Sequence, residues 1–304
     1  MTRLLVVGAT GQVGRELLRS LKPLGEVVAT SRDGRLEDGS ACQAVDLADL
    51  AGLERLVDRI KPSAVINAAA YTAVDKAESD QEAAFAVNGQ APGALARACA
   101  RAAVPFVHYS TDYVFDGQGA VPYREDAPTA PLGVYGASKL AGEEAVRAAG
   151  GQHLILRTAW VYAAHGHNFL RTMLRLGSER DELRVVADQV GSPTPAALIA
   201  DVTAMALSQA LASARTSGTW HLVAAGETSW HGFAEAIFED AIAAGLLPRA
   251  PRVVPITTAD YPTPAKRPAY SRLDTSGLER DFGVELPDWR QALARVIDEL
   301  VQAR

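Results

Sequence analysis

The sequence predicts an α/β fold in which a doubly wound parallel sheet carries helices on both faces. Short apolar runs alternate with helical patterns through the first half of the chain, and a glycine-rich turn follows the first run. Strands that alternate with helices in this way form parallel sheets with right-handed crossovers. Prolines gather near the C-terminus, so we expect a smaller, loop-rich lobe to complete the protein.

The elements follow from these patterns in chain order. Apolar runs typical of strands occupy residues 4–7, 27–30, 42–45, 64–67, 104–110, 153–157 and 219–223. Helical patterns occupy residues 11–21, 50–60, 81–102, 135–149, 168–176 and 197–212. Glycine and proline mark residues 188–195 as a loop. We therefore expect one domain of residues 1–160 plus about 196–224, and a substrate-binding lobe of about 161–195 and 225–304.

The composition excludes several classes of protein. The 304 residues are 48% apolar and carry a net charge of −6, without the basic surplus typical of nucleic-acid binding. The two cysteines, Cys42 and Cys99, lack metal-ligand spacing, and His165-Gly166-His167 lacks a third ligand nearby, so we expect no metal. No apolar stretch is long enough to span a membrane. We expect a cytoplasmic protein that acts on a small molecule.

A phosphate-binding turn is predicted directly after the first strand. Glycines at positions 8, 11 and 14 permit a tight turn and let the backbone approach a diphosphate closely, and the following helix supplies free N–H groups. A glycine pattern alone is weak, but here it has the strand–turn–helix context that a Rossmann-like domain requires. The residues expected to contact a dinucleotide here are Gly8, Thr10, Gly11, Gln12, Val13 and Gly14.

The ends of the next strands bear on which dinucleotide binds. The second strand ends in Thr30-Ser31-Arg32, and a hydroxyl beside a guanidinium suits a 2′-phosphate, which favours NADP(H). Asp33 follows and keeps NADH possible. Further cofactor contacts are expected where the third and fourth strands end, from Asp46, Leu47, Asn67, Ala68, Ala69 and Tyr71. For Asp46 and Asn67, an ordinary turn cap is the alternative interpretation.

Tyr135 and Lys139 are the candidate catalytic pair. They are four residues apart, so on a helix they share one face. A nearby ammonium favours the phenolate, and we therefore expect Lys139 to lower the pKa of Tyr135. The pair alone also fits a solvated helix, but a hydroxyl-rich strand end, Ser110-Thr111-Asp112-Tyr113, lies upstream. Together with the glycine turn, it favours proton transfer next to a dinucleotide.

With these motifs in place, the chain resembles the dTDP-4-dehydrorhamnose reductase family of extended short-chain dehydrogenases/reductases. Six further segments carry this resemblance: 65–78 (VINAAAYTAVDKAE), 109–117 (YSTDYVFDG), 131–136 (PLGVYG), 156–162 (LRTAWVY), 188–194 (DQVGSPT) and 262–268 (PTPAKRP). Together with the glycine turn, they extend from residue 8 to about residue 270, nearly the whole chain.

The resemblance implies a reaction and a set of roles. The family reduces the C4 keto group of dTDP-6-deoxy-L-lyxo-4-hexulose to give dTDP-L-rhamnose, with hydride from a reduced nicotinamide. By similarity, Tyr135 donates the proton, and Thr111 forms a hydrogen bond with the carbonyl oxygen. Lys139 lowers the pKa of Tyr135 and binds the nicotinamide ribose. Two hydroxyl donors aimed at the oxygen that gains charge would stabilise it.

The resemblance also implies a substrate-binding set: Thr111, Asp112, Tyr113, Trp160, Asn168 and Arg267. Trp160 would stack on the thymine ring, with core packing as the alternative interpretation. Asn168 and Arg267 would face the sugar diphosphate, which a guanidinium grips in two places, with a surface charge as the alternative for Arg267.

Other functions stay open at this point. An epimerase or dehydratase of nucleotide sugars uses the same Tyr/Lys pair, and Asp112 after Thr111 is compatible with a dehydratase. A non-catalytic, NADP-binding regulatory subunit is a third possibility. Some relatives are described as Mg²⁺-dependent dimers, but residues 195–198 read PAAL, without a carboxylate to bind magnesium. The resemblance therefore does not carry a magnesium site to this chain, and both a monomer and a homodimer stay open.

Overall fold

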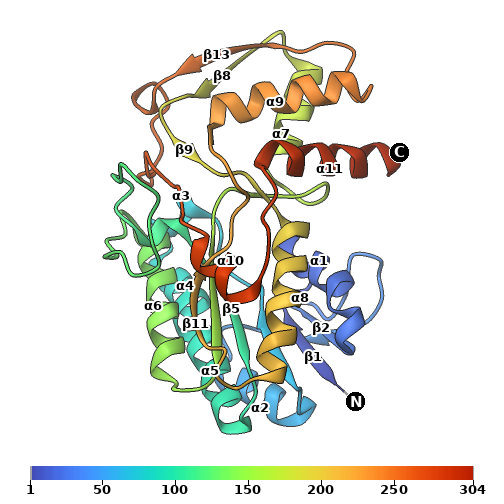
Figure 1. Ribbon diagram of the computed structural model, residues 1–304, viewed down its shortest axis with the longest axis vertical. Helices are drawn as coiled ribbons and strands as arrows, with labels where there is room; N and C mark the ends of the chain where they lie inside the picture. The colour runs from blue at the N-terminus through green and yellow to red at the C-terminus, as the bar shows by residue number, and fades with distance from the viewer. Residues whose placement is uncertain (1, 304) are drawn as a thin grey trace.

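The computed structural model describes residues 2–303. Its centre is a seven-stranded parallel sheet in the order β11-β6-β5-β4-β1-β2-β3 (Figure 1). The strands are β1 (Arg3–Val7), β2 (Glu26–Ser31), β3 (Gln43–Ala44), β4 (Ala64–Asn67), β5 (Phe106–Thr111), β6 (His153–Thr158) and β11 (Gly218–His221). All seven were predicted to within two residues. The strand order reverses between β1 and β4, and ligands bind at such a switch point in open α/β sheets.

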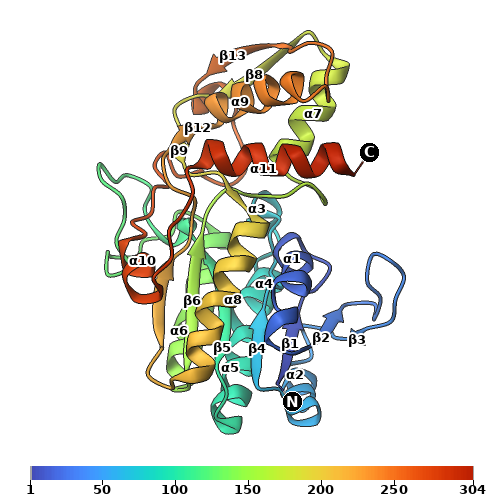
Figure 2. The same cartoon turned by 45° about the vertical axis from the view of Figure 1, so that its right-hand side comes forward.

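Helices cover both faces of this sheet, as its doubly wound topology requires (Figures 1 and 2). They are α1 (Gln12–Ser20) and α8 (Ala196–Ala212) on one face, and α2 (Leu50–Ile60), α5 (Ala91–Ala102) and α6 (Val134–Ala148) on the other. Successive residues of β1 point to opposite faces, so Leu4 and Val6 pack toward α8 while Leu5 and Val7 pack toward α2 and α5. Both faces are therefore buried, which explains why the strands are continuous apolar runs.

The second part of the molecule is a lobe beyond the carboxyl ends of the strands, which the chain enters after β6 (Figure 2). Its helices are α7 (Phe169–Glu179), α9 (Trp230–Ala243) and α11 (Trp289–Gln302), and β8 (Glu182–Val186) pairs with β13 (Arg252–Ile256). Short pairs join β7 (Val161–Tyr162) to β10 (Thr194–Pro195), and β9 (Val190–Gly191) to β12 (Thr228–Ser229). The lobe is smaller than the sheet domain, as expected, but it contains more helix than its proline-rich sequence predicts.

The lobe has a hydrophobic core of its own, built around Tyr162, Phe233 and Leu293. The helix α10 (Ser276–Phe282) does not join that core. Its Leu278 and Phe282 pack with the sheet domain instead. We therefore propose a domain boundary that differs from the predicted one, with α10 assigned to the sheet domain rather than to the substrate-binding lobe.

A buried ion pair joins α6 to the sheet. One guanidinium edge of Arg157 on β6 donates two hydrogen bonds to Glu143 on α6, at 2.8 Å from Nε and 2.7 Å from Nη2. The Glu143 side chain is fully buried and that of Arg157 is 4% exposed. These hydrogen bonds lower the pKa of Glu143 even though burial opposes ionisation. The pair fixes the helix that carries Tyr135 and Lys139.

Candidate active site

The glycine turn closes tightly over the carboxyl end of β1. Gly8 has a φ of +86°, and a Cβ there would lie 2.6 Å from the backbone nitrogen of Ala69. A Cβ on Gly14 would lie 2.0 Å from the carbonyl oxygen of Gly8. Gly11, the N-cap of α1, offers no side chain to cap the helix. The free N–H groups of α1 therefore face the crevice, as an anion-binding turn requires.

A cleft of about 940 Å³ runs from this turn along the carboxyl edge of the sheet. The predicted cofactor residues that line it are Gly8, Thr10, Gly11, Gln12, Val13, Ser31, Arg32, Asp46, Leu47, Ala68, Ala69, Tyr71, Tyr135 and Lys139. Gly14 and Asn67 do not line it. Gly14 lies behind Gly8, and the buried Asn67 accepts a hydrogen bond from the Ala69 N–H at 3.2 Å. These two shape the wall and do not present a surface to a ligand.

One end of the cleft carries the features expected for a 2′-phosphate. Arg32 and Arg35 both line it, and Arg32 forms no hydrogen bond or ion pair among residues 2–303. Asp33, which kept NADH possible, accepts from the Ser31 hydroxyl at 2.9 Å, and this bond lowers its pKa. The Asp33 carboxylate is therefore engaged within its own turn, whereas the guanidinium of the adjacent Arg32 has no partner among residues 2–303. Sequence reasoning missed Arg35, because the turn at residues 31–35 brings it back to the cleft.

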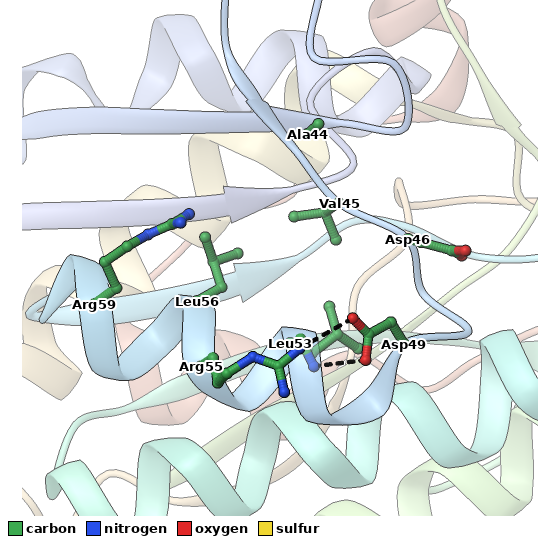
Figure 3. A pocket seen from close by; sticks show the side chains of 9 residues that line it. Ala44, Val45, Asp46, Asp49, Leu53, Arg55, Leu56 and Arg59 are labelled. Atoms are coloured by element: carbon green, nitrogen blue, oxygen red, sulfur yellow. Dashed lines mark hydrogen bonds and ion pairs between the residues drawn. The ribbon is translucent and has the colours of Figure 1, made fainter.

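A second hollow of about 460 Å³ lies beside the first, between β3 and α2 (Figure 3). Val45 and Asp46 line both. Asp49 caps α2 by accepting from the Gly52 N–H at 2.8 Å and also pairs with Arg55 at 3.3 Å. The lining of this hollow does not include Tyr135 or Lys139. The reacting groups therefore belong to the larger cleft.

Two of the three catalytic candidates, Tyr135 and Lys139, line the other end of the larger cleft, whereas Thr111 is not among its lining residues. Tyr135 and Lys139 project from α6, and Lys139 Nζ donates to the Tyr109 carbonyl oxygen at 2.6 Å. Thr111 ends β5, and its hydroxyl donates to Asp112 Oδ1 at 2.9 Å. Because that hydroxyl proton is directed at Asp112, the predicted bond from Thr111 to a substrate carbonyl requires its hydroxyl to rotate.

The expectation that the pKa of Tyr135 is lowered is wrong for this structure. Burial raises the pKa of Tyr135 to about 12, the charge of Asp112 raises it too, and a hydrogen bond with Thr111 acts in the other direction. Burial also lowers the pKa of Lys139 to about 8. Desolvation is the largest cause, and one of the three protons of the Lys139 ammonium is directed at the Tyr109 carbonyl rather than at Tyr135. Tyr135 is thus held protonated at neutral pH, the form that a proton donor needs.

The predicted substrate residues fall into two groups. Tyr113 contacts Tyr135 edge-on, with ring centroids 5.3 Å apart. Burial raises the pKa of Tyr113, and the positive charge of Arg267 opposes that rise. Arg267 donates to Asp75 at 2.7 Å, and its buried Nη1 has no partner among the described residues. Tyr113 thus adjoins Tyr135, and Arg267 lies near Tyr113.

Trp160 and Asn168 are engaged within the protein. Trp160 stacks on Trp230 with centroids 3.6 Å apart, so one face of its ring is covered. Asn168 caps α7 through the Arg171 N–H at 3.1 Å, and its amide donates to Gln12 at 2.8 Å. The structure therefore gives Asn168 a positioning role. Its contact with the sugar diphosphate and the stacking of Trp160 on thymine stay predictions.

Residues 2–303 contain no group of three or more histidine, cysteine, aspartate or glutamate side chains that could hold a metal ion. No helix within the same residues has the length and apolarity needed to cross a membrane.

Comparison with known proteins identifies the family. Residues 1–302 match the family described as RmlD substrate binding domain. The dTDP-4-dehydrorhamnose reductase of Burkholderia thailandensis is 53% identical over 98% of this chain and 99% of its own. The chain belongs to the dTDP-4-dehydrorhamnose reductase family. The enzyme of that name from Escherichia coli K12 is 45% identical over 98% of this chain and 97% of its own.

Solved structures agree with this family. A dTDP-4-dehydrorhamnose reductase from Clostridium acetobutylicum superimposes with a TM-score of 0.89 at 37% identity, covering 98% of this chain and 99% of that one. One from Bacillus anthracis, in complex with NADP, gives a TM-score of 0.87 at 33% identity, covering 98% and 100%. This reductase-family chain is therefore an oxidoreductase with a Rossmann-like fold.

Replacing Gly14 by alanine is expected to damage the turn of this reductase-family chain. The added Cβ would meet backbone, so the turn must shift, and such overpacking costs about 1–3 kcal/mol. We expect a lower thermal midpoint and NADPH binding at least about tenfold weaker. Gly11→Ala is the stability control, because its Cβ would have no neighbour nearer than 3.5 Å. Equal midpoints for the two variants would contradict the prediction.

Asp112 is expected to make stability pH-dependent. Burial raises its pKa to about 6, above the unfolded value of 3.8. A raised carboxyl pKa stabilises the fold at low pH, and this contribution is lost as pH rises through about 6. Relative to wild type, Asp112→Asn should therefore gain about 1 kcal/mol of unfolding free energy between pH 5 and pH 7.5. Urea unfolding at both pH values tests this; a constant difference would contradict it.

Two positioning residues were missed from the sequence. Asn88 lies in a π-helical turn, Ala86–Gln90, and its amide donates to the Tyr71 carbonyl and to Ser138 Oγ, each at 3.0 Å. Glu78 accepts from the Val134 N–H at 2.9 Å, at the start of α6. Both hold the helix of Tyr135 in place, and π-turns often occur at functional sites.

Proposed function

We propose that this chain catalyses the NADPH-dependent reduction of the C4 keto group of dTDP-6-deoxy-L-lyxo-4-hexulose to dTDP-L-rhamnose, the last step in making that sugar nucleotide. The observation that carries this proposal is that Tyr135 and Lys139, one helical turn apart on α6, both line a cleft that starts at the glycine turn. Membership of the dTDP-4-dehydrorhamnose reductase family supports both the proposed substrate and the proposed reaction, reduction of a keto group.

The residues of the chain account for the proton transfer. A reduced nicotinamide supplies the hydride to C4, and the electrons of the C=O bond move to oxygen. Tyr135 donates its proton to that oxygen, and Thr111 supplies a second hydroxyl once it rotates from Asp112. Lys139, charged below a pH of about 8, stabilises the phenolate until solvent returns the proton.

The cofactor cleft supports NADPH over NADH. The free Arg32 and the neighbouring Arg35 supply positive charge where a 2′-phosphate would lie, and Asp33 is engaged with Ser31. Gly8 and Gly11 would hold the diphosphate against the backbone at the start of α1. Lys139 would hold the nicotinamide ribose.

Arg267 is the proposed anchor for the diphosphate of the sugar nucleotide. Asp75 fixes one guanidinium edge at 2.7 Å and leaves the buried Nη1 without a partner among residues 2–303. A phosphate oxygen would satisfy that donor, which otherwise costs free energy. Tyr113 stands between Arg267 and Tyr135, on the path from the phosphates to the reacting carbon.

The deciding experiment is to incubate the protein with dTDP-6-deoxy-L-lyxo-4-hexulose and NADPH and to follow nicotinamide absorbance. The proposal requires one NADPH consumed per dTDP-L-rhamnose formed. An epimerase or dehydratase would convert a nucleotide sugar without net consumption of NADPH, and a regulatory subunit would bind NADPH without turnover. Either result would reject the proposed reaction. A cytoplasmic location and the choice between monomer and homodimer stay predictions.

A further inference from the structure

A short segment of the lobe, residues 163–168, crosses to the first helix of the sheet domain, and we call it the strap. Asn168 Nδ2 donates to Gln12 Oε1 at 2.8 Å. His165 Nε2 lies 2.8 Å from Glu16 Oε1. Two successive turns of α1 are therefore tied to the lobe directly behind the glycine turn.

The strap is also held in shape by bonds on its own side. Asn168 Nδ2 lies 2.9 Å from the Ala163 carbonyl and 3.0 Å from that of His165. Arg171 donates to the Ala164 carbonyl at 2.6 Å. Gly166, with a φ of +69°, passes so close that an added Cβ would lie 3.3 Å from Gln12 Cγ. Contacts within the protein thus hold the strap in its conformation.

The strap also lines the cofactor cleft, next to the start of α1. His165, Gly166 and His167 line the same cleft as Gly8 and Gln12. His165 is engaged with Glu16, whereas His167 is exposed and forms no hydrogen bond among residues 2–303. Residues 8–14 include no lysine or arginine. The other cationic side chains that line the cleft, Arg32, Arg35 and Lys139, are assigned to the 2′-phosphate and the ribose, which leaves the His167 imidazole for the diphosphate.

We propose that His167 binds the diphosphate of NADPH together with the glycine turn, with the Asn168–Gln12 and His165–Glu16 contacts holding the strap in position. This inference rests on the proposed function, because it requires a dinucleotide in the cleft. An imidazole N–H donates to phosphate oxygens and gains strength when protonated. The lobe that binds the sugar nucleotide would thereby also help to bind the cofactor.

The test is calorimetric titration of the apoprotein with NADPH and, separately, with 2′-AMP. The second ligand keeps the adenosine and the 2′-phosphate but has no diphosphate. His167→Ala is expected to weaken NADPH binding about tenfold and to leave 2′-AMP within about twofold of wild type. His167→Lys should restore NADPH affinity, since an ammonium also binds phosphate.

Two further variants complete the design. His165→Ala removes the contact with Glu16 that helps to hold the strap. It should weaken NADPH binding by a smaller factor, about threefold, and leave 2′-AMP binding unchanged. His231→Ala is the matched control, because it removes a comparable contact, His231–Glu235 at 3.3 Å, within α9. Its NADPH affinity should equal that of wild type.

The results separate the inference from the proposed function. Unchanged NADPH affinity in His167→Ala would overturn the inference, and so would an equal loss for NADPH and 2′-AMP, since the effect would then not lie at the diphosphate. Failure of wild type to bind NADPH at all would reject the proposed function instead.

Discussion

Tyr135→Phe is expected to reduce turnover by about 10²- to 10⁴-fold and to leave the dissociation constant of NADPH within about twofold of wild type. The substitution removes the proton donor and keeps the ring that packs edge-on against Tyr113. Steady-state turnover with saturating substrate measures the first effect, and calorimetric titration with NADPH measures the second.

The control for this variant is Tyr109→Phe. Tyr109 also lies at the cleft, but its hydroxyl is 2.8 Å from Thr203 on α8 and faces away from the reacting groups. We expect its turnover within about threefold of wild type. If Tyr135→Phe kept more than a tenth of wild-type turnover, another group would have to deliver the proton.

Glu143→Ala is expected to destabilise the protein by about 3–5 kcal/mol, because it leaves the buried guanidinium of Arg157 without its counter-charge. That loss is a large fraction of the stability of a typical domain. Urea unfolding at neutral pH gives the difference in free energy.

Two comparisons make the prediction for Glu143→Ala specific. The double variant Glu143→Leu/Arg157→Met should be more stable than Glu143→Ala, since no buried charge is left unpaired. Glu179→Ala removes an exposed pair with Arg175 at 3.0 Å and should cost at most about 0.5 kcal/mol. Similar losses from the buried and the exposed substitutions would contradict the account.

The central sheet was predictable because its information is local. Each inner strand is buried on both faces, so residues 4–7 and 64–66 are unbroken apolar runs bounded by turn signals. The helix predicted over residues 81–102 is present, but it contains the π-turn at Ala86–Gln90. No local pattern marks that turn, since it depends on Asn88 bonding to Tyr71 and Ser138.

The lobe was harder to predict. Six prolines between residues 248 and 268 outweighed the helical patterns on either side, so α9 and α11 were missed. The return of α10 to the sheet domain depends on Leu278 and Phe282 finding a tertiary partner, which no spacing reveals.

The site shows the same division between local and spatial information. The glycine turn and the Tyr135–Lys139 pair are sequence motifs, and the structure places them on one cleft. The sign of the pKa shift of Tyr135 depends on burial, which only the folded chain defines. Arg35 and the strap enter the cleft through a turn and a lobe contact, so sequence order does not reveal them.

The late return of α10 to the sheet domain has a consequence for synthesis on the ribosome. The inner strands β1, β4 and β5 are complete once Thr111 has been added, but the edge strand β11 needs residues 218–221, and α10 packs on β11 and α8. A nascent chain that stalls between β11 and α10 leaves an apolar side of the sheet domain uncovered. Such chains should be cleaved quickly by proteases, whereas release after α11 gives a resistant product.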